Sequence, residues 1–95
     1  MRLMLKFTIP VKRGNEAVAD GTISQTLEAL VQATKAEAAY FTLINGERAG
    51  YVFFHEDNQA RLPQLNEPLF AALDAAIEIV PVLTLDDLKR DLPPR

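Results

Sequence analysis

Residues 2–9 alternate between strongly apolar and mixed positions along the chain. An alternation of this kind predicts a β-strand that buries one of its two faces. Pro10 follows directly and would end the strand. The buried face would carry Leu3, Leu5, Phe7 and Ile9.

The dipeptide Asn45-Gly46 separates two further apolar runs, residues 38–44 and 47–54. Asn-Gly tolerates the positive φ angles of a two-residue type I′ turn, so the two runs are predicted to form a β-hairpin. The turn also sets the register. Tyr40 would lie opposite Tyr51, and Phe41 would lie opposite Gly50 and cover its bare backbone.

Helical spacing of apolar residues marks the region between the first strand and the hairpin. Residues 12–15 are polar and contain glycine, so we expect a loop there, with Asn15 capping the helix that follows. Gly21 is a weak point that would split off the first turns. The helix is expected to end near residues 35–37. Its apolar side would consist of Ile23, Leu27, Leu30 and Val31.

Two prolines divide the helical region after the hairpin. Pro63 and Pro68 argue against one regular helix, so we predict two short pieces at 58–65 and 67–74. Asn66 would cap the second piece. The buried side of this region would consist of Leu62, Leu65, Leu69, Phe70 and Leu73.

Residues 76–84 are predicted to form the last strand. Pro81 removes a backbone donor, so this strand should lie at an edge of the sheet or carry a bulge. Thr84 would cap a final short helix. The charges of this helix suit the macrodipole, with Asp86 and Asp87 at its start and Lys89 and Arg90 near its end.

The predicted element order is βαββαβ within a single domain over residues 1–95. Right-handed crossovers and the central hairpin fold this order into an α+β, ferredoxin-like arrangement. The four-stranded antiparallel sheet would have strand order 4-1-3-2, with both helices on one face. That order places Lys6 beside Glu78 on neighbouring strands.

Two helices can cover only one face of such a sheet. The covered face should be pure core, with Leu5 and Phe41 as examples. The other face would expose a mixed apolar patch, and a patch of that kind usually marks an interface. A C2 homodimer, with its two sheets packed face to face around a small cavity, is the simplest solution. The open face would carry Met4, Lys6, Thr8, Tyr40, Thr42, Ile44, Tyr51, Phe53, His55, Glu78, Val80 and Val82.

Four segments of the chain resemble the dimeric α+β barrel superfamily. They read MLKFTIP at 4–10, GYVFF at 50–54, EPLF at 67–70 and IVPV at 79–82. The chain is most similar to small, functionally uncharacterised bacterial proteins near muconolactone isomerase. The resemblance implies the fold and the homodimer. The wider superfamily includes isomerases, cofactor-free monooxygenases, haem-degrading enzymes and proteins of no known activity, and none of their catalytic signatures is present.

His55 is the single histidine, placed at the end of a strand on the open face. It is a candidate general base or haem ligand at the mouth of the barrel. The alternative, which we favour because the sequence identifies no partner nucleophile, is a histidine hydrogen-bonded to a loop. A zinc site is disfavoured, because Glu56 and Asp57 would point in different directions and Asp57 would cap a helix. No metal or other cofactor is expected.

Aromatic residues of the open face are the candidates for ligand binding. Tyr40 and Tyr51 would stack on an aromatic or quinone-like ligand while their hydroxyl groups orient it, with Phe53 beside them. Ordinary packing in the core of the dimer is the alternative, because aromatic residues are enriched at interfaces.

Polar residues of the same face complete the candidate site. Lys6 and Glu78 would act either as an acid–base pair or, as we favour, as a structural ion pair. Thr8 and Thr42 would donate hydrogen bonds to a ligand, although threonine is common in strands. The full predicted ligand set is Tyr40, Tyr51, Phe53, His55, Lys6, Thr8 and Thr42.

Composition narrows the classes of function. The net charge of −3 argues against nucleic acid or an anionic membrane as the main partner. The sequence has no cysteine, which excludes disulfides, thiolate catalysis and cysteine-ligated metals. We find no signal peptide or membrane span and expect a cytoplasmic protein. Three hypotheses stay open: a dimer that binds an apolar or aromatic metabolite, a cofactor-independent isomerase or monooxygenase, and an interaction module without a ligand.

Overall fold

A computed structural model describes residues 1–92 as an α+β arrangement with one four-stranded antiparallel sheet. The strands are β1 (Arg2–Ile9), β2 (Ala38–Ile44), β3 (Glu47–His55) and β4 (Ala76–Pro81). The helices are α1 (Val11–Ala19), α2 (Thr22–Thr34), the 3-10 turn η1 (Gln59–Arg61), α3 (Leu62–Leu73) and α4 (Leu85–Asp91).

The strands follow the order β2-β3-β1-β4 across the sheet. Read from the β4 edge this is the order 4-1-3-2 that the sequence predicts. β1 is central and pairs antiparallel with both β3 and β4. Pro81 ends the edge strand β4, where its missing N–H interrupts no ladder. The last strand is shorter than predicted, because it stops at Pro81 and does not reach Thr84.

The predicted hairpin register is confirmed. Tyr40 pairs with Tyr51 and Phe41 pairs with Gly50 across β2 and β3. Asn45 and Gly46 have φ angles of 51° and 79°, so both residues of the turn adopt the positive φ that Asn-Gly tolerates.

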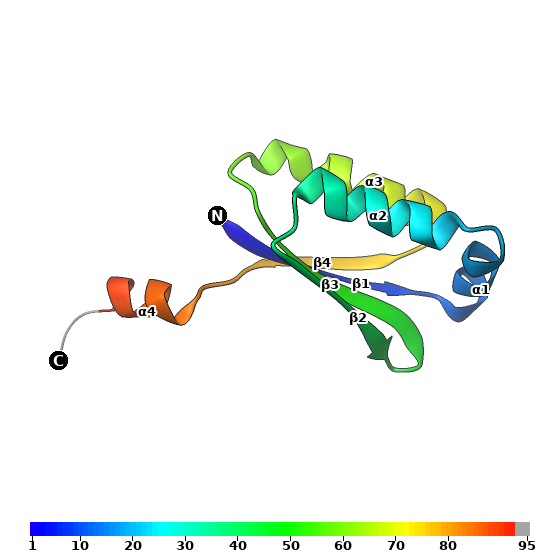
Figure 1. Ribbon diagram of the computed structural model, residues 1–95, viewed down its shortest axis with the longest axis horizontal. Helices are drawn as coiled ribbons and strands as arrows, with labels where there is room; N and C mark the ends of the chain where they lie inside the picture. Colours follow the sequence, from blue (N-terminus) through cyan, green and yellow to red (C-terminus); the bar gives the residue numbers. More distant parts are fainter. Residues whose placement is uncertain (93–95) are drawn as a thin grey trace.

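Helices α2 and α3 lie side by side over one face of the sheet (Figure 1). The core forms between this helix layer and the sheet, as the alternation along β1 predicts. Side chains from both the sheet and the helices are almost completely buried, and this packing holds the helices on this face. The largest of these buried side chains are Phe7, Phe54, Leu5, Ile9, Leu69, Leu73 and Val52.

The first helical region differs from the prediction at its start. There is no loop at 12–15, because α1 begins at Val11, directly after Pro10. Pro10 holds φ at −56° and initiates the helix, and the buried Gly14 packs against Arg48. Asn15 caps no helix; its side-chain oxygen accepts a hydrogen bond from Arg48 Nη2 at 3.1 Å. The split at Gly21 is confirmed, since this residue has φ 80° between α1 and α2.

The second helical region consists of the short turn η1 and one continuous helix, α3, so the predicted break between residues 65 and 67 is wrong. Pro63 lies in the first turn of α3, where its missing N–H has no partner in any case. Pro68 lies inside the helix. The buried leucine stripe of α3 outweighs the local cost of that proline, because tertiary packing supplies most helix stability. Asn66 is therefore an interior residue and not a cap, and its buried Oδ1 accepts no hydrogen bond from the described residues.

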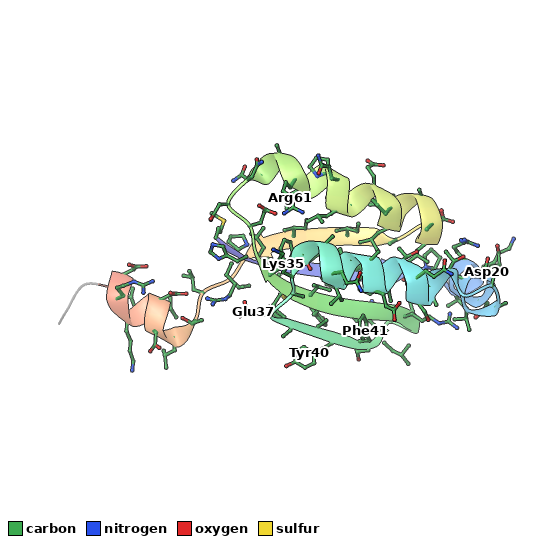
Figure 2. The ribbon with its side chains drawn as sticks, turned by 45° about the horizontal axis from the view of Figure 1, so that its top comes forward. Asp20, Lys35, Glu37, Tyr40, Phe41 and Arg61 are labelled. Atoms are coloured by element: carbon green, nitrogen blue, oxygen red, sulfur yellow. The ribbon has the colours of Figure 1, made fainter. Side chains whose placement is uncertain are left out.

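Strand β2 projects past the helix layer, which corrects the prediction that the whole helix side of the sheet, Phe41 included, is core. Phe41 and Leu43 point to the helix side of the sheet yet are 56% and 69% exposed. Figure 2 shows Phe41 on the outer strand, and its side chain lines an open hollow together with residues of α2. The two helices pack over the inner strands, so the helix side of β2 is an apolar surface and not core.

Helix α4 stands apart from the rest of the molecule, beyond the end of the sheet (Figure 1). Thr84 caps it as predicted: its hydroxyl accepts from the Asp87 N–H at 3.0 Å, and Asp87 accepts from the Thr84 N–H at 3.0 Å. Over residues 1–92, no helix has both the length and the apolar character that crossing a bilayer requires.

Candidate functional site

The candidate site is the face of the sheet that α2 and α3 leave uncovered (Figure 1). The strand registers arrange its side chains in three rows that run across all four strands. The central row is Glu78, Lys6, Tyr51 and Tyr40. One flanking row is Val80, Met4, Phe53 and Ala38, and the other is Ala76, Thr8, Ala49 and Thr42.

Aromatic rings gather on the β2–β3 half of this face. The Tyr40 and Phe53 rings lie edge to face with centroids 6.4 Å apart. Tyr40 is 65% exposed, whereas Tyr51 and Phe53 are half-buried. An edge-to-face pair beside a second tyrosine offers ring surface and two hydroxyl groups to a flat molecule.

Polar groups gather on the β1–β4 half. Lys6 and Glu78 are register partners, but no ion pair joins them in the part of the chain that the structure describes. With Thr8 they line a hollow of about 180 Å³. The expected structural ion pair is therefore absent from this arrangement, and Lys6 Nζ is available to a polar group of a ligand.

Thr8 and Thr42 flank the small, buried Ala49 in the third row. Six of the seven predicted ligand residues thus share one continuous surface. That surface was predictable, because the hairpin register determines which side chains share a face.

His55 is the seventh, and it lies at the end of the same face, one row beyond the other six. It pairs with Arg2 at the end of β3, past the row that contains Phe53. Its Nε2 lies 3.0 Å from the Met1 amine and 3.1 Å from Asp57 Oδ1. The Met1 amine also donates to Asp57 at 2.6 Å, and this hydrogen bond and charge, followed by the charge of His55, lower the pKa of Asp57.

These contacts correct one detail of the sequence analysis. Asp57 points toward His55 and caps no helix; Asn58 caps η1 instead, accepting from the Ala60 N–H at 3.0 Å. The structure also separates His55 from Thr8 and Thr42, which lie toward the other end of the face. A proton transfer between this histidine and either hydroxyl would need a substrate that spans the sheet.

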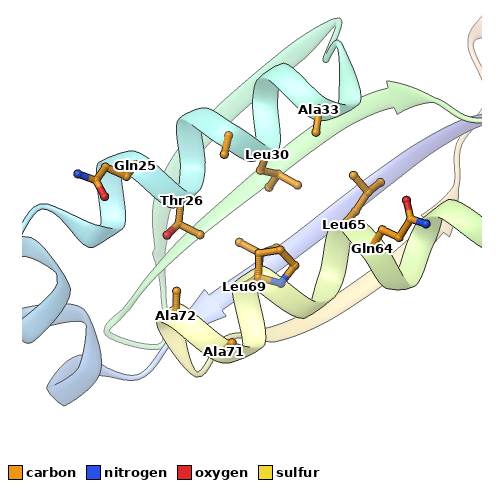
Figure 3. A pocket seen from close by; sticks show the side chains of 11 residues that line it. Gln25, Thr26, Leu30, Ala33, Gln64, Leu65, Leu69, Ala71 and Ala72 are labelled. Carbon is orange, nitrogen blue, oxygen red and sulfur yellow. The ribbon is translucent and has the colours of Figure 1, made fainter.

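A second hollow, which the sequence analysis missed, lies between α2 and α3 and has a volume of about 440 Å³ (Figure 3). Small side chains on the facing sides of the two helices leave the gap. Ala29 and Ala33, one turn apart on α2, were the sequence signal that could have indicated it. The lining is mostly apolar and contains no charged residue, so it offers shape but no acid–base chemistry.

Comparisons with known proteins bear on the fold alone. No family model and no curated protein matches the chain. Among solved structures it resembles the "De novo designed protein Ferredog-Diesel", with a TM-score of 0.51 and 12% identity over 85% of each chain. The chain is therefore a small α+β domain compatible with a ferredoxin-like fold, and the predicted kinship with muconolactone isomerase stays a prediction.

Proposed function

We propose that the protein is a homodimer whose open sheet faces pack on each other and enclose a site for a small apolar or aromatic molecule. One observation carries the proposal: the uncovered face presents an aromatic half and a polar half side by side. A ferredoxin-like chain that pairs in this way would form a dimeric α+β barrel.

The composition of the open face supports burial against a second copy. A sheet face in contact with water carries mostly polar side chains. This face instead presents Met4, Tyr51, Phe53 and Val80 on adjacent strands. Neighbouring apolar side chains of this kind mark a contact surface. The same face is too polar at Lys6 and Glu78 for a dry core, which favours a site that retains some space.

The two halves of the face define how a ligand would lie. Its ring would stack against Tyr51 and Tyr40, and its polar substituent would reach Lys6 and Thr8. Binding is favoured over catalysis because Lys6 is the register partner of Tyr51, whereas His55 lies two rows away at the end of β3. The two-fold axis would bring a second copy of each group to the same cavity.

A ligand screen by thermal shift, followed by calorimetry on the best binder, tests the proposal. We expect flat aromatic compounds with one polar substituent to raise the melting temperature. Tyr51→Ala should weaken binding at least tenfold, through the loss of ring stacking. His55→Ala is the matched control and should leave the affinity within a factor of about two. If Tyr51→Ala leaves the affinity of the ligand unchanged, the ligand binds elsewhere on the protein.

A further inference from the structure

The central row of the open face carries its charged residues at one edge of the sheet and its tyrosines at the other. Glu78 lies on the edge strand β4 and Lys6 on β1, whereas Tyr51 lies on β3 and Tyr40 on the opposite edge strand β2. Figure 2 shows the Tyr40 side chain extending from β2 away from the helix layer. Within residues 1–92, neither Lys6 nor Glu78 takes part in an ion pair. The two charged groups are therefore open to contact from another molecule.

Tyr40 cannot reach Glu78 within its own chain. The two residues are three strands apart, and three spacings of about 4.8 Å place them about 14 Å from each other. The hollow of about 180 Å³ beside Glu78 is lined by Lys6 and Thr8 as well. A tyrosine that covers this hollow from above has to come from a second chain.

Two sheets packed face to face with aligned strands allow two orientations of the two-fold axis. An axis perpendicular to the strands places each strand over its own copy, so Lys6 faces the partner's Lys6 and Glu78 faces the partner's Glu78. Like charges buried opposite each other oppose association. An axis parallel to the strands exchanges the two edges, so β4 lies over the partner's β2 and β1 lies over the partner's β3.

From this charge pattern we infer that the axis runs parallel to the strands, and that Tyr40 and Tyr51 of the partner subunit close the hollow beside Lys6 and Glu78. The inference rests on the proposed homodimer and specifies which chain supplies each side of the ligand site. Glu78 accepts a hydrogen bond from the partner's Tyr40 hydroxyl, and Lys6 lies opposite the partner's Tyr51. The dimer then contains two identical sites, each with polar groups from one chain and tyrosines from the other.

The flanking rows of the open face fit the same axis. Rotation about an axis parallel to the strands keeps each row at its own height, so the apolar row lies over itself and Met4 faces the partner's Phe53. An axis perpendicular to the strands and centred on the face would instead lay this apolar row over the row that contains Thr8 and Thr42. Packed sheets lie about 10 Å apart, which leaves room for one layer of interdigitating side chains. Apolar contacts across that layer favour the parallel axis.

Cross-linking tests this pairing directly, because the wild-type sequence contains no cysteine. Glu78→Cys and Tyr40→Cys replace exposed residues and are prepared as separate full-length chains. Each chain is treated with a short bis-maleimide alone, and again after mixing and equilibration with the other. We expect a covalent dimer on a denaturing gel for the mixture only. Positions 78 and 40 face each other across the parallel axis, whereas two copies of the same position lie about 17 Å apart.

Two results of this experiment overturn the inference and leave the dimer standing. Cross-linking of Glu78→Cys to its own copy would indicate the perpendicular axis. A mixture that is dimeric by light scattering but gives no covalent product would show that the two edges do not face each other. A monomeric wild-type protein overturns the proposed function as well.

The dissociation constant of the dimer gives a second measurement that needs no cysteine variant. Tyr40→Phe removes the hydroxyl group, and Glu78→Ala removes the carboxylate. Each single substitution should raise the dissociation constant about tenfold, and the double variant should raise it no further than the larger single effect, because both substitutions break the same hydrogen bond. Effects that multiply in the double variant, or a dissociation constant that neither substitution changes, overturn the contact between Glu78 and the partner's Tyr40.

Discussion

The two faces of the sheet are built by the same strands and differ in what they present. On the helix side, Leu5, Phe7, Val52 and Phe54 are 0–1% exposed and uniformly apolar. On the other side, aromatic rings, a lysine and threonines share adjacent positions. The first composition specifies packing within one chain. The second fits neither core nor solvent, which is why we propose that it contacts a second copy and a small molecule.

Neighbouring phenylalanines on β3 allow the two faces to be compared directly. Phe54 is buried under the helices and Phe53 lies on the open face. Phe54→Ala should lower the free energy of unfolding by about 3–5 kcal/mol at every protein concentration, because it leaves a cavity. Phe53→Ala should lower the free energy of unfolding by less, and this loss should become smaller on dilution as the dimer dissociates. Denaturant unfolding at two concentrations measures both, and equal, concentration-independent losses would remove the distinction.

The rings of Phe7 and Phe41 approach Gly50 closely, which allows a second test of the tight packing on the helix side. A Cβ atom on Gly50 would lie 2.5 Å from Phe7 Cε2 and 2.9 Å from Phe41 Cδ1. Gly50→Ala should therefore cost about 1–3 kcal/mol by overpacking. Phe7→Leu removes the nearer ring, so the double variant should lose less than the sum of the two single losses. Strict additivity in thermal unfolding would show that the contact does not constrain this position.

The hairpin turn sets the register on which both faces depend. Gly46 has φ 79°, and a Cβ atom on it would meet no other group within 4 Å, so any penalty for a side chain there comes from the backbone alone. Gly46→Val should lower the free energy of unfolding by about 1–2 kcal/mol. Gly46→Asn, which tolerates positive φ, should lose clearly less. Matching melting midpoints for Val and wild type would mean that the turn does not control the register.

The smallest effect concerns helix α4. Hydrogen bonds from the Thr84 N–H and hydroxyl, followed by one from Arg90, lower the pKa of Asp87. Because the folded pKa lies below the unfolded one, the stabilisation is complete above the unfolded pKa and is lost as pH falls through the folded pKa. Carbon NMR of the Asp87 carboxyl should show a low titration midpoint that rises in Thr84→Ala. An identical midpoint in that variant would refute the role of the cap.

Local chemistry made part of this molecule predictable. Asn45-Gly46 determined the turn and the register, so the rows of the open face followed from sequence. Thr84 determined the start of α4. Pro68 did not break its helix and Phe41 did not become core, because both outcomes depend on where α2 and α3 lie over the sheet. That lateral position results from tertiary packing, and no short segment encodes it.

The most direct test of the account is the solution mass of the protein and of Phe53→Asp, measured by light scattering at micromolar concentration. The open face as a self-association surface predicts twice the chain mass of 10.6 kDa for the wild type. It predicts a single-chain mass for Phe53→Asp, since a carboxylate there would be buried without a partner. A wild-type mass of one chain, or a variant that stays dimeric, would contradict the account.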